Sequence, residues 1–213
     1  MPDAPSNAER LREISERASV CTACRLADTR RSVVFGEGNP DAPLVFVGEG
    51  PGDREDATGR PFVGRAGVLL DECMRECKLT RAHVYICNVV KCRACVVEDG
   101  RASNRPPSPL EIEACHQWLD QQLSVIKPLV IVCLGSPSAN ALIHKGFSIT
   151  RERGQWFSTC PYSRYVTAAL HPAYILRQAG EAFNQARASL VADIEAARKK
   201  VIEARKEDPL TLF

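Results

Sequence analysis

LVFVGEGPGDREDATGRPFVGRAG, residues 44–67, is the stretch from which the organisation of this chain of 213 residues follows. Its first residues form a short apolar run with two valines that stops at Gly48, a pattern typical of a buried strand that opens into a loop. The loop contains glycines, prolines and acidic residues around one aromatic side chain, Phe62. Because glycines allow the backbone to approach a ligand and present its N–H groups to it, we interpret this loop as the candidate active site. A solvated surface turn is the alternative interpretation.

Four apolar runs alternate with helical patterns along the chain. We expect strands at residues 43–48, 83–90, 128–134 and 164–170, and helices at 7–20, 67–79, 108–126 and 181–206, with a short helix after Ser136. Ser108 and Glu111 have the spacing of a capping box at the start of a helix. Such alternation predicts an α/β fold with three layers, α/β/α, in which helices cover both faces of a mostly parallel sheet in a single domain. Residues 96–109 are expected to form a loop.

Polar residues follow three of the expected strand ends. Glu49 opens the loop after the first strand, Asn88 lies at the end of the second, and His171 follows the fourth. Since ligands of such sheets bind beyond the carboxyl ends of the strands, we expect these residues to converge on one cleft. The glycine spacing of the loop matches neither the GxxxxGK[ST] nor the GxGxxG pattern, so a nucleotide-binding loop is excluded.

The composition is that of an ordinary globular protein, with 45% apolar and 25% charged residues and a formal net charge of +2. This charge permits nucleic-acid binding without arguing for it. Apolar segments do not reach the length of a membrane span, about 20 residues, and the N-terminus lacks the apolar core of a signal peptide. We therefore expect a cytoplasmic protein with no membrane contact. We also expect a monomer, associated with the nucleoid of a bacterial or archaeal cell.

The chain contains ten cysteines, which in a cytosolic protein favours metal ligation, buried thiols or redox chemistry over disulfides. A double CxxC set, Cys21 and Cys24 with Cys92 and Cys95, is typical of a zinc site. Replacing Cys95 by the more distant Cys115 gives four thiolates for an iron–sulfur cluster. Thiols that only pack in the core are the third possibility. The spacing alone slightly favours zinc.

Several short motifs, taken in order, match those of a known family. They are GEGPG at residues 48–52 with Glu55-Asp56, GRPFVG at 59–64, Asn88 before KCR at 91–93, Asn104-Arg105-x-Pro107, Leu134-Gly135, and HPAYILR at 171–177. Over residues 20–200 the chain thus resembles the family-4 uracil-DNA glycosylases, the iron–sulfur branch of their superfamily. The resemblance implies a DNA repair enzyme, a single α/β domain with a central parallel four-stranded sheet. It also implies a structural [4Fe–4S] cluster on Cys21, Cys24, Cys92 and Cys115, and it overrides the preference for zinc.

The resemblance also divides the chain. Residues 1–20 are a helical extension, residues 21–206 form the glycosylase domain, and residues 207–213 are a tail. The tail sequence PLTLF, residues 209–213, resembles the LxLF core of peptides that bind the bacterial sliding clamp, and an apolar segment of this kind can dock in a groove. Packing of the tail onto the domain is the alternative.

The resemblance implies that uracil is extruded from DNA into a pocket at the glycine loop, because a base inside the stack cannot be reached. Asn88 would recognise the base, since its carboxamide can accept from N3–H and donate to O4, a pattern that cytosine does not offer. An asparagine that only caps the strand end is the alternative. Phe62 would stack on the base, and Gly48 and Gly50 would line the pocket.

Cleavage of the N-glycosidic bond develops positive charge on the sugar and negative charge on uracil, so both ends need electrostatic stabilisation. The resemblance implies that His171 donates to uracil O2, aided by the Gly50 N–H, and that Glu55 faces the sugar and orients the attacking water. Glu49 belongs to the same motif, where its backbone matters more than its carboxylate. A turn residue before proline is the alternative for His171.

DNA contacts are expected from two segments. One is the basic loop with Arg151 and Arg153. The other is the HPAYILR segment, where Arg177 would contact phosphate and Ile175 or Tyr174 would fill the gap left by the extruded base. Core packing is the alternative for Ile175.

Residues 94–103 are an insertion relative to the family pattern. A related X-type branch also carries an insertion here, with a histidine that traps DNA covalently. Residues 92–109 of this chain contain no histidine, so we expect turnover. A protein that binds uracil-containing DNA with little turnover is the second hypothesis, and a zinc module that binds nucleic acid is the third.

Overall fold

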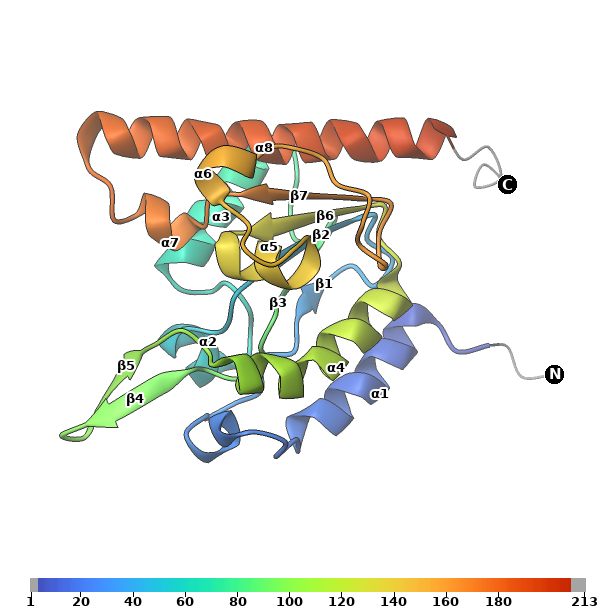
Figure 1. The fold of residues 1–213 in the computed structure, drawn as a ribbon. Helices are drawn as coiled ribbons and strands as arrows, with labels where there is room; N and C mark the ends of the chain where they lie inside the picture. The colour runs from blue at the N-terminus through green and yellow to red at the C-terminus, as the bar shows by residue number, and fades with distance from the viewer. Residues whose placement is uncertain (1–3, 208–213) are drawn as a thin grey trace.

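The four expected strands form the centre of the structure. The computed structural model describes residues 4–207, and within them the main sheet has five strands in the order β1-β3-β2-β6-β7 (Figure 1). These are β1 (Glu37–Gly38), β2 (Leu44–Gly48), β3 (Tyr85–Asn88), β6 (Val130–Leu134) and β7 (Tyr165–Ala169). Neighbours among β3, β2, β6 and β7 are parallel, which confirms the predicted centre of the fold. β1 adds a short antiparallel strand beside β3.

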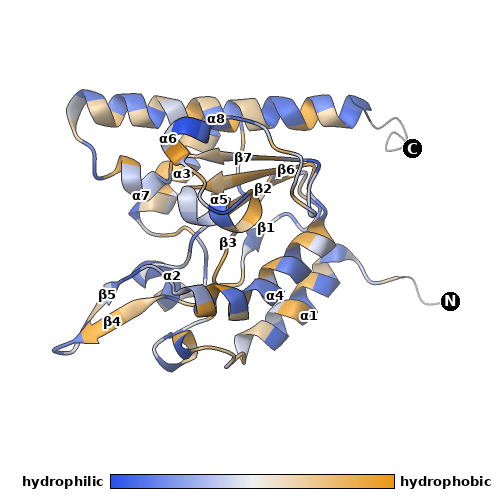
Figure 2. Cartoon of the chain, viewed as in Figure 1, coloured by the Kyte–Doolittle hydropathy of each residue, from blue (hydrophilic) through white to orange (hydrophobic). Residues whose placement is uncertain are grey.

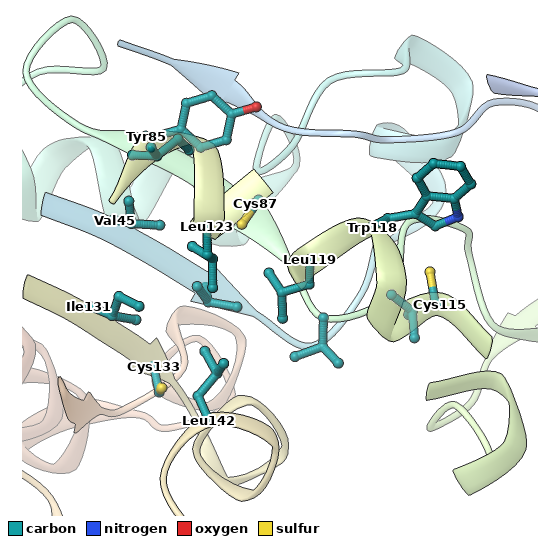
Figure 3. Packing of buried hydrophobic residues seen from close by; sticks show 14 of the residues in the cluster. Val45, Tyr85, Cys87, Cys115, Trp118, Leu119, Leu123, Ile131, Cys133 and Leu142 are labelled. Atoms are coloured by element: carbon teal, nitrogen blue, oxygen red, sulfur yellow. The ribbon is translucent and has the colours of Figure 1, made fainter. Parts of the chain in front are cut away.

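Helices cover both faces of this sheet, because successive side chains of a strand point to opposite sides. Val45 and Val47 of β2 pack in one apolar cluster with α1, α4 and α5, whereas Leu44 and Phe46 pack in a second cluster with α3, α7 and α8. The bounds of these helices are α1 (Asn7–Ser19), α3 (Arg65–Glu76), α4 (Pro109–Ile126), α5 (Ser136–Leu142), α7 (Pro172–Ile175) and α8 (Gly180–Glu207). Figure 3 shows part of the first cluster, with residues of α4 beside those of the strands.

The long helices have the apolar stripes and caps that the sequence predicts. Hydrophobic and hydrophilic residues alternate along α8 (Figure 2), and its buried Leu190, Ile194 and Ala197 recur at the helical spacing that faces a core. The capping box predicted at the start of α4 is confirmed, with Glu111 N–H donating to Ser108 Oγ at 3.3 Å and Ser108 N–H donating to the Glu111 carboxylate at 2.7 Å.

The loop expected at residues 96–109 contains a β-hairpin instead. Its strands are β4 (Cys95–Glu98) and β5 (Arg101–Asn104), which pair antiparallel. Asp99 and Gly100 connect them with φ angles of 50° and 73°, and an Asp-Gly pair with positive φ at both positions is the turn that suits a two-residue hairpin. The expectation of a loop was therefore wrong, and the Val-Val-Glu-Asp-Gly sequence carried the signal for the hairpin.

Short elements inside other loops were also missed. The glycine-rich loop after β2 contains α2 (Asp53–Thr58), and the basic loop contains α6 (Ile149–Glu152); a 3₁₀ helix at Arg25–Asp28 follows the first cysteine pair. α2 lacks apolar periodicity, because Asp53, Arg54 and Asp56 interrupt its short sequence. These elements matter because α2 carries Glu55.

The carboxyl end of β2 is the topological switch point of the sheet. The chain passes from β2 to β3 on one side, and the later strand β6 lies on the other side of β2. In doubly wound sheets the connections on either side of such a strand diverge and leave a crevice. The glycine-rich loop begins at this point.

Among residues 4–207, no helix combines the length and the apolar character that crossing a membrane requires. The clamp-binding motif predicted at residues 209–213 lies outside the described residues, so it stays a prediction.

Candidate active site

A cleft of about 480 Å³ opens at the carboxyl ends of the parallel strands. It is lined by the loop after β2, by α2, by the end of β3, by the base of the β4–β5 hairpin and by the start of α7. Six of the residues predicted from the sequence line it together: Glu49, Gly50, Glu55, Phe62, Asn88 and His171. The predicted convergence of three strand ends on one cleft is therefore confirmed.

Asn88 supplies an unused hydrogen-bond acceptor to the cleft. The residue is only 2% exposed, and its Oδ1 has no hydrogen-bond partner within the part of the chain that the structure describes. Its backbone carbonyl is held from behind by the buried Lys91, whose Nζ donates to it at 2.7 Å. A buried amide oxygen without a partner is unfavourable by about 1–3 kcal/mol. We therefore interpret Oδ1 as the acceptor for a ligand N–H group.

Gly48 keeps Asn88 and Phe62 in place beside each other. A Cβ at residue 48 would lie 2.4 Å from Asn88 Oδ1 and 2.6 Å from Phe62 Cζ, distances at which both side chains have to move. Glycine at this position therefore makes room for the amide and the aromatic ring at the base of the cleft.

Replacing Gly48 with alanine is expected to lower kcat/KM for uracil-containing DNA by about tenfold to a hundredfold, since overpacking of this kind typically costs about 1–3 kcal/mol. Steady-state kinetics on a uracil-containing oligonucleotide checks this. Gly146→Ala is the control, because a Cβ there would meet nothing within 4 Å, and any strain of an alanine at its positive φ lies away from the residues that line the cleft. An unchanged kcat/KM in Gly48→Ala would contradict the assigned role.

The ring of Phe62 is set by an unusual backbone conformation. Its φ of 52° lies in the left-handed region, which a bulky residue adopts only when its surroundings impose it. Arg81 provides this restraint, because its guanidinium donates to the carbonyl oxygens of Pro61 at 2.9 Å and Phe62 at 2.5 Å and is itself paired with Asp71. The Phe62 ring lies 5.8 Å from that of His171 with an interplanar angle of 32°. Sequence reasoning missed Arg81, which lies in no recognised motif.

His171 caps the N-terminus of α7, and this contact fixes its tautomer. Its Nδ1 accepts a hydrogen bond from the Ala173 N–H at 3.0 Å, so we assign the ring proton to Nε2, where it is available as a donor. Burial, with a smaller contribution from Arg177, lowers the pKa of His171 to about 4. The imidazole is therefore neutral at physiological pH and donates without carrying a charge.

Glu55 is held rigidly by backbone groups of the loop. Its Oε1 accepts hydrogen bonds from the N–H groups of Val63 at 3.0 Å and Gly64 at 2.8 Å. Gly52 leaves space for the other oxygen, since a Cβ there would lie 2.8 Å from Oε2. The carboxylate is thus oriented from one side while Oε2 stays available to the cleft. Glu49 also lines the cleft, and burial raises the pKa of its carboxyl group.

One of the predicted DNA contacts is corrected by the structure. Ile175 is fully buried in the second apolar cluster, so the core-packing alternative holds and Ile175 cannot wedge into DNA. Arg153 is paired with Asp193 of α8 at 2.6 Å, and its contact with DNA stays a prediction. Arg151 and Arg177 are exposed, and the guanidinium of Arg177 lies over the exposed ring of Tyr174.

The four cysteines of the iron–sulfur alternative surround one small cavity. Cys21, Cys24, Cys92 and Cys115 all line it, and Cys95 does not. N–H groups point at three of the sulfurs: Trp118 Nε1 at 3.4 Å from Cys21, Lys91 N at 3.2 Å from Cys115 and Arg30 Nη1 at 3.6 Å from Cys92. Among the described residues, no three His, Cys, Asp or Glu side chains are arranged around a single metal-ion position.

Arg93 joins the β4–β5 hairpin to α2 at the wall of the cleft. It is 5% exposed, and its guanidinium donates to Asp53 of α2 at 2.5 Å and to Asn104 of β5 at 2.7 Å. Asn104 itself lines the cleft. Arg93 and Asn104 stand in the motifs noted in the sequence, but nothing there assigned them this role.

Together the fold and the cleft define a doubly wound α/β protein in which an amide, a histidine and a carboxylate converge at the carboxyl ends of parallel strands. The family model of the uracil DNA glycosylase superfamily matches residues 35–195, a range that includes all the cleft residues named above. The chain therefore belongs to the uracil DNA glycosylase superfamily, as the motifs predicted.

Several curated proteins named type-4 uracil-DNA glycosylase are similar to this chain over most of its length. The protein from Thermotoga maritima is 47% identical over 89% of this chain and 94% of its own. Those from Archaeoglobus fulgidus and Saccharolobus solfataricus are 40% and 35% identical, over 79% and 93% of this chain and 84% and 88% of their own lengths.

Proposed function

We propose that this chain is a monofunctional uracil-DNA glycosylase, a hydrolase that extrudes uracil from DNA, cleaves its N-glycosidic bond and leaves an abasic site. The observation that carries the proposal is the unpaired Oδ1 of Asn88, buried beside Phe62 and His171 in a cleft of about 480 Å³. Ligand pockets have volumes of this order. The names of the similar proteins support the same activity.

Base recognition follows from the hydrogen-bonding pattern of the cleft. Uracil presents an N3–H donor and an O4 acceptor on one edge, and the Asn88 amide offers the complementary acceptor and donor. Cytosine presents the reverse pattern, so it would leave buried polar groups unpaired, which penalises binding. Phe62 would stack on the base from one side.

Bond cleavage needs stabilisation of charge at two places. His171 Nε2–H would donate to O2 of the departing uracil, together with the Gly50 N–H, and stabilise the anion. The Oε2 atom of Glu55 would face the sugar, where its negative charge stabilises the oxocarbenium ion and orients the attacking water. Glu49 also lines the cleft, and its carboxylate, whose pKa is raised by burial, would accept a proton from that water.

The activity is tested on a 5′-labelled oligonucleotide with a single uracil. We expect strand breaks only after alkaline treatment, because a monofunctional glycosylase leaves the backbone intact. Release of no free uracil under conditions in which a control glycosylase releases it would rule the activity out. A protein–DNA adduct that resists denaturant would favour the second hypothesis, covalent capture with little turnover.

We also propose that Cys21, Cys24, Cys92 and Cys115 hold a [4Fe–4S] cluster. Four thiols around one cavity match the ligand set of such a cluster, and N–H groups directed at ligating sulfurs are typical outer-sphere partners. When bound, the group would supply a structural crosslink rather than a reaction step. It would join the segment after α1 to the end of β3 and to α4.

Cys115→Ser is expected to abolish the visible absorbance of the cluster and to lower the iron and sulfide content of protein purified without oxygen. Cys95→Ser is the matched control, since Cys95 is also buried but does not line the cavity, and it should keep both. Loss of absorbance in both variants, or bound zinc in place of iron in the wild type, would contradict the assigned ligand set.

A further inference from the structure

The β4–β5 hairpin is a projecting ribbon beside the cleft. Figure 1 shows it extending away from the body of the molecule, with α2 near its base. Its apolar residues Val96 and Val97 are 40% and 58% exposed. Residues at the roots of its two strands, Ala94 and Asn104, line the cleft. The hairpin therefore continues one wall of the cleft into solvent.

This ribbon is anchored at its base. Arg93 ties Asn104 of β5 to Asp53 of α2 through the two hydrogen bonds described above. On the other side, the Arg105 N–H donates to the Ala94 carbonyl at 3.0 Å, and the Arg105 guanidinium is paired with Glu111 of α4 at 2.6 Å. Both roots are thus fixed to helices of the domain, so the hairpin is a preformed surface.

The register of the hairpin separates two different faces. Cys95 pairs with Asn104 and Val97 with Ala102, whereas Val96 pairs with Ser103 and Glu98 with Arg101. Side chains alternate along a strand, so Val97 and Ala102 share the face of Asn104, whose side chain lines the cleft. This cleft-side face carries no charged side chain along its paired residues. The outer face carries Val96 and the oppositely charged pair Glu98 and Arg101.

We propose that the cleft-side face of the hairpin, Val97 and Ala102, packs along the DNA strand next to the extruded uridine; this inference rests on the proposed function. A strand of four residues is about 13 Å long, and DNA carries one phosphate per about 3.4 Å of each strand. The face is therefore long enough to follow about four nucleotides. Its lack of carboxylates suits a polyanion, and its small apolar side chains suit the faces of sugars and bases.

The test introduces a charge at residue 97 on the cleft-side face and, in separate variants, at the neighbouring residue 96 on the outer face. The variants are Val97→Asp and Val97→Lys on the cleft side, and Val96→Asp and Val96→Lys on the outer side. Affinity is measured by fluorescence anisotropy for an oligonucleotide with a stable abasic-site analogue, and kcat and KM are measured for one with uracil. Binding to the abasic analogue does not depend on excision, so failure of this inference is separable from failure of the proposed activity.

We expect Val97→Asp to bind the DNA about fivefold more weakly and Val97→Lys about fivefold more tightly than the wild type, because one charge near a phosphate in water is worth about 1 kcal/mol. The DNA affinities of Val96→Asp and Val96→Lys should each lie within about twofold of the wild type, since screening weakens interactions beyond about 10 Å. The constant for inhibition by free uracil should not change in any variant. Equal effects at the two positions, or no effect at residue 97, would overturn the proposal. Val97→Thr, which adds no charge, checks that the hairpin tolerates substitution.

Discussion

Replacing His171 with alanine is expected to lower kcat for uracil release by about 10²–10³-fold, the loss typical for one donor to a developing anion. The KM for the oligonucleotide should change little, because the hydrogen bond strengthens only as charge develops on O2. Single-turnover measurement of strand breaks after alkali gives the rate. His171→Asn should recover part of it, since asparagine can still cap α7 and offers an N–H donor.

His144→Ala is the control, because His144 is exposed and does not line the cleft. The pH dependence provides a further check. With a pKa of about 4, His171 stays neutral between about pH 5 and about pH 8, so its ring should not titrate there by NMR. Since the folded pKa lies below the ordinary value of 6.5, the neutral form contributes stability above about pH 6.5, and this contribution is lost as the pH falls towards 4. A ring that titrates near pH 6.5 in the folded protein would contradict the assignment.

The second large effect is expected for Glu55→Gln, which should lower kcat by about 10²–10³-fold. The change keeps an oxygen that can accept from the Val63 and Gly64 N–H groups, so the side chain remains in place. The substitution removes the negative charge that is proposed to face the sugar. Rapid-quench kinetics with saturating enzyme isolates this chemical step from DNA binding.

Asp56→Asn is the matched control for this variant. Asp56 is the next residue of α2 and is 1% exposed, but it accepts from the backbone N–H groups of Arg31 and Ser32 and does not line the cleft. We expect a lower melting temperature and a kcat within about threefold of the wild type, since the residue acts on stability alone. If both variants lost kcat equally, α2 would act only as a scaffold, and Glu55 would need another role.

The main elements were predictable because their signals are local. Val45, Ile131 and Val166 lie in apolar runs that only a buried strand explains, and the long helices carry caps or a regular apolar stripe. β1 was missed because Glu37 and Gly38 have no strand signal, and its pairing depends on the edge that β3 presents. The hairpin was missed because glycine and proline content was taken as a sign of a loop, although Asp99-Gly100 is a specific turn.

The residues of the candidate site that lie in recognised sequence motifs could be predicted. Asn88 and His171 stand at strand ends, where topology brings them together. Arg81 could not be found, because its contacts are to backbone carbonyls that sequence does not reveal. Ile175 was misassigned because a four-residue helix gives too short a pattern to tell a buried face from an exposed one.

The left-handed backbone of Phe62 has a consequence for the energetics of recognition. Such a conformation costs about 1–3 kcal/mol, and Arg81 holds it in the free protein through two carbonyl oxygens. The free-energy cost of this conformation is therefore part of folding and is not added when a ligand binds. If uracil stacks on Phe62 as proposed, it meets an aromatic surface that is already immobile, so little conformational entropy is lost on binding. Under the proposed function, the hydrogen-bonding discrimination by Asn88 therefore takes place beside a preorganised ring and requires no induced fit around the base.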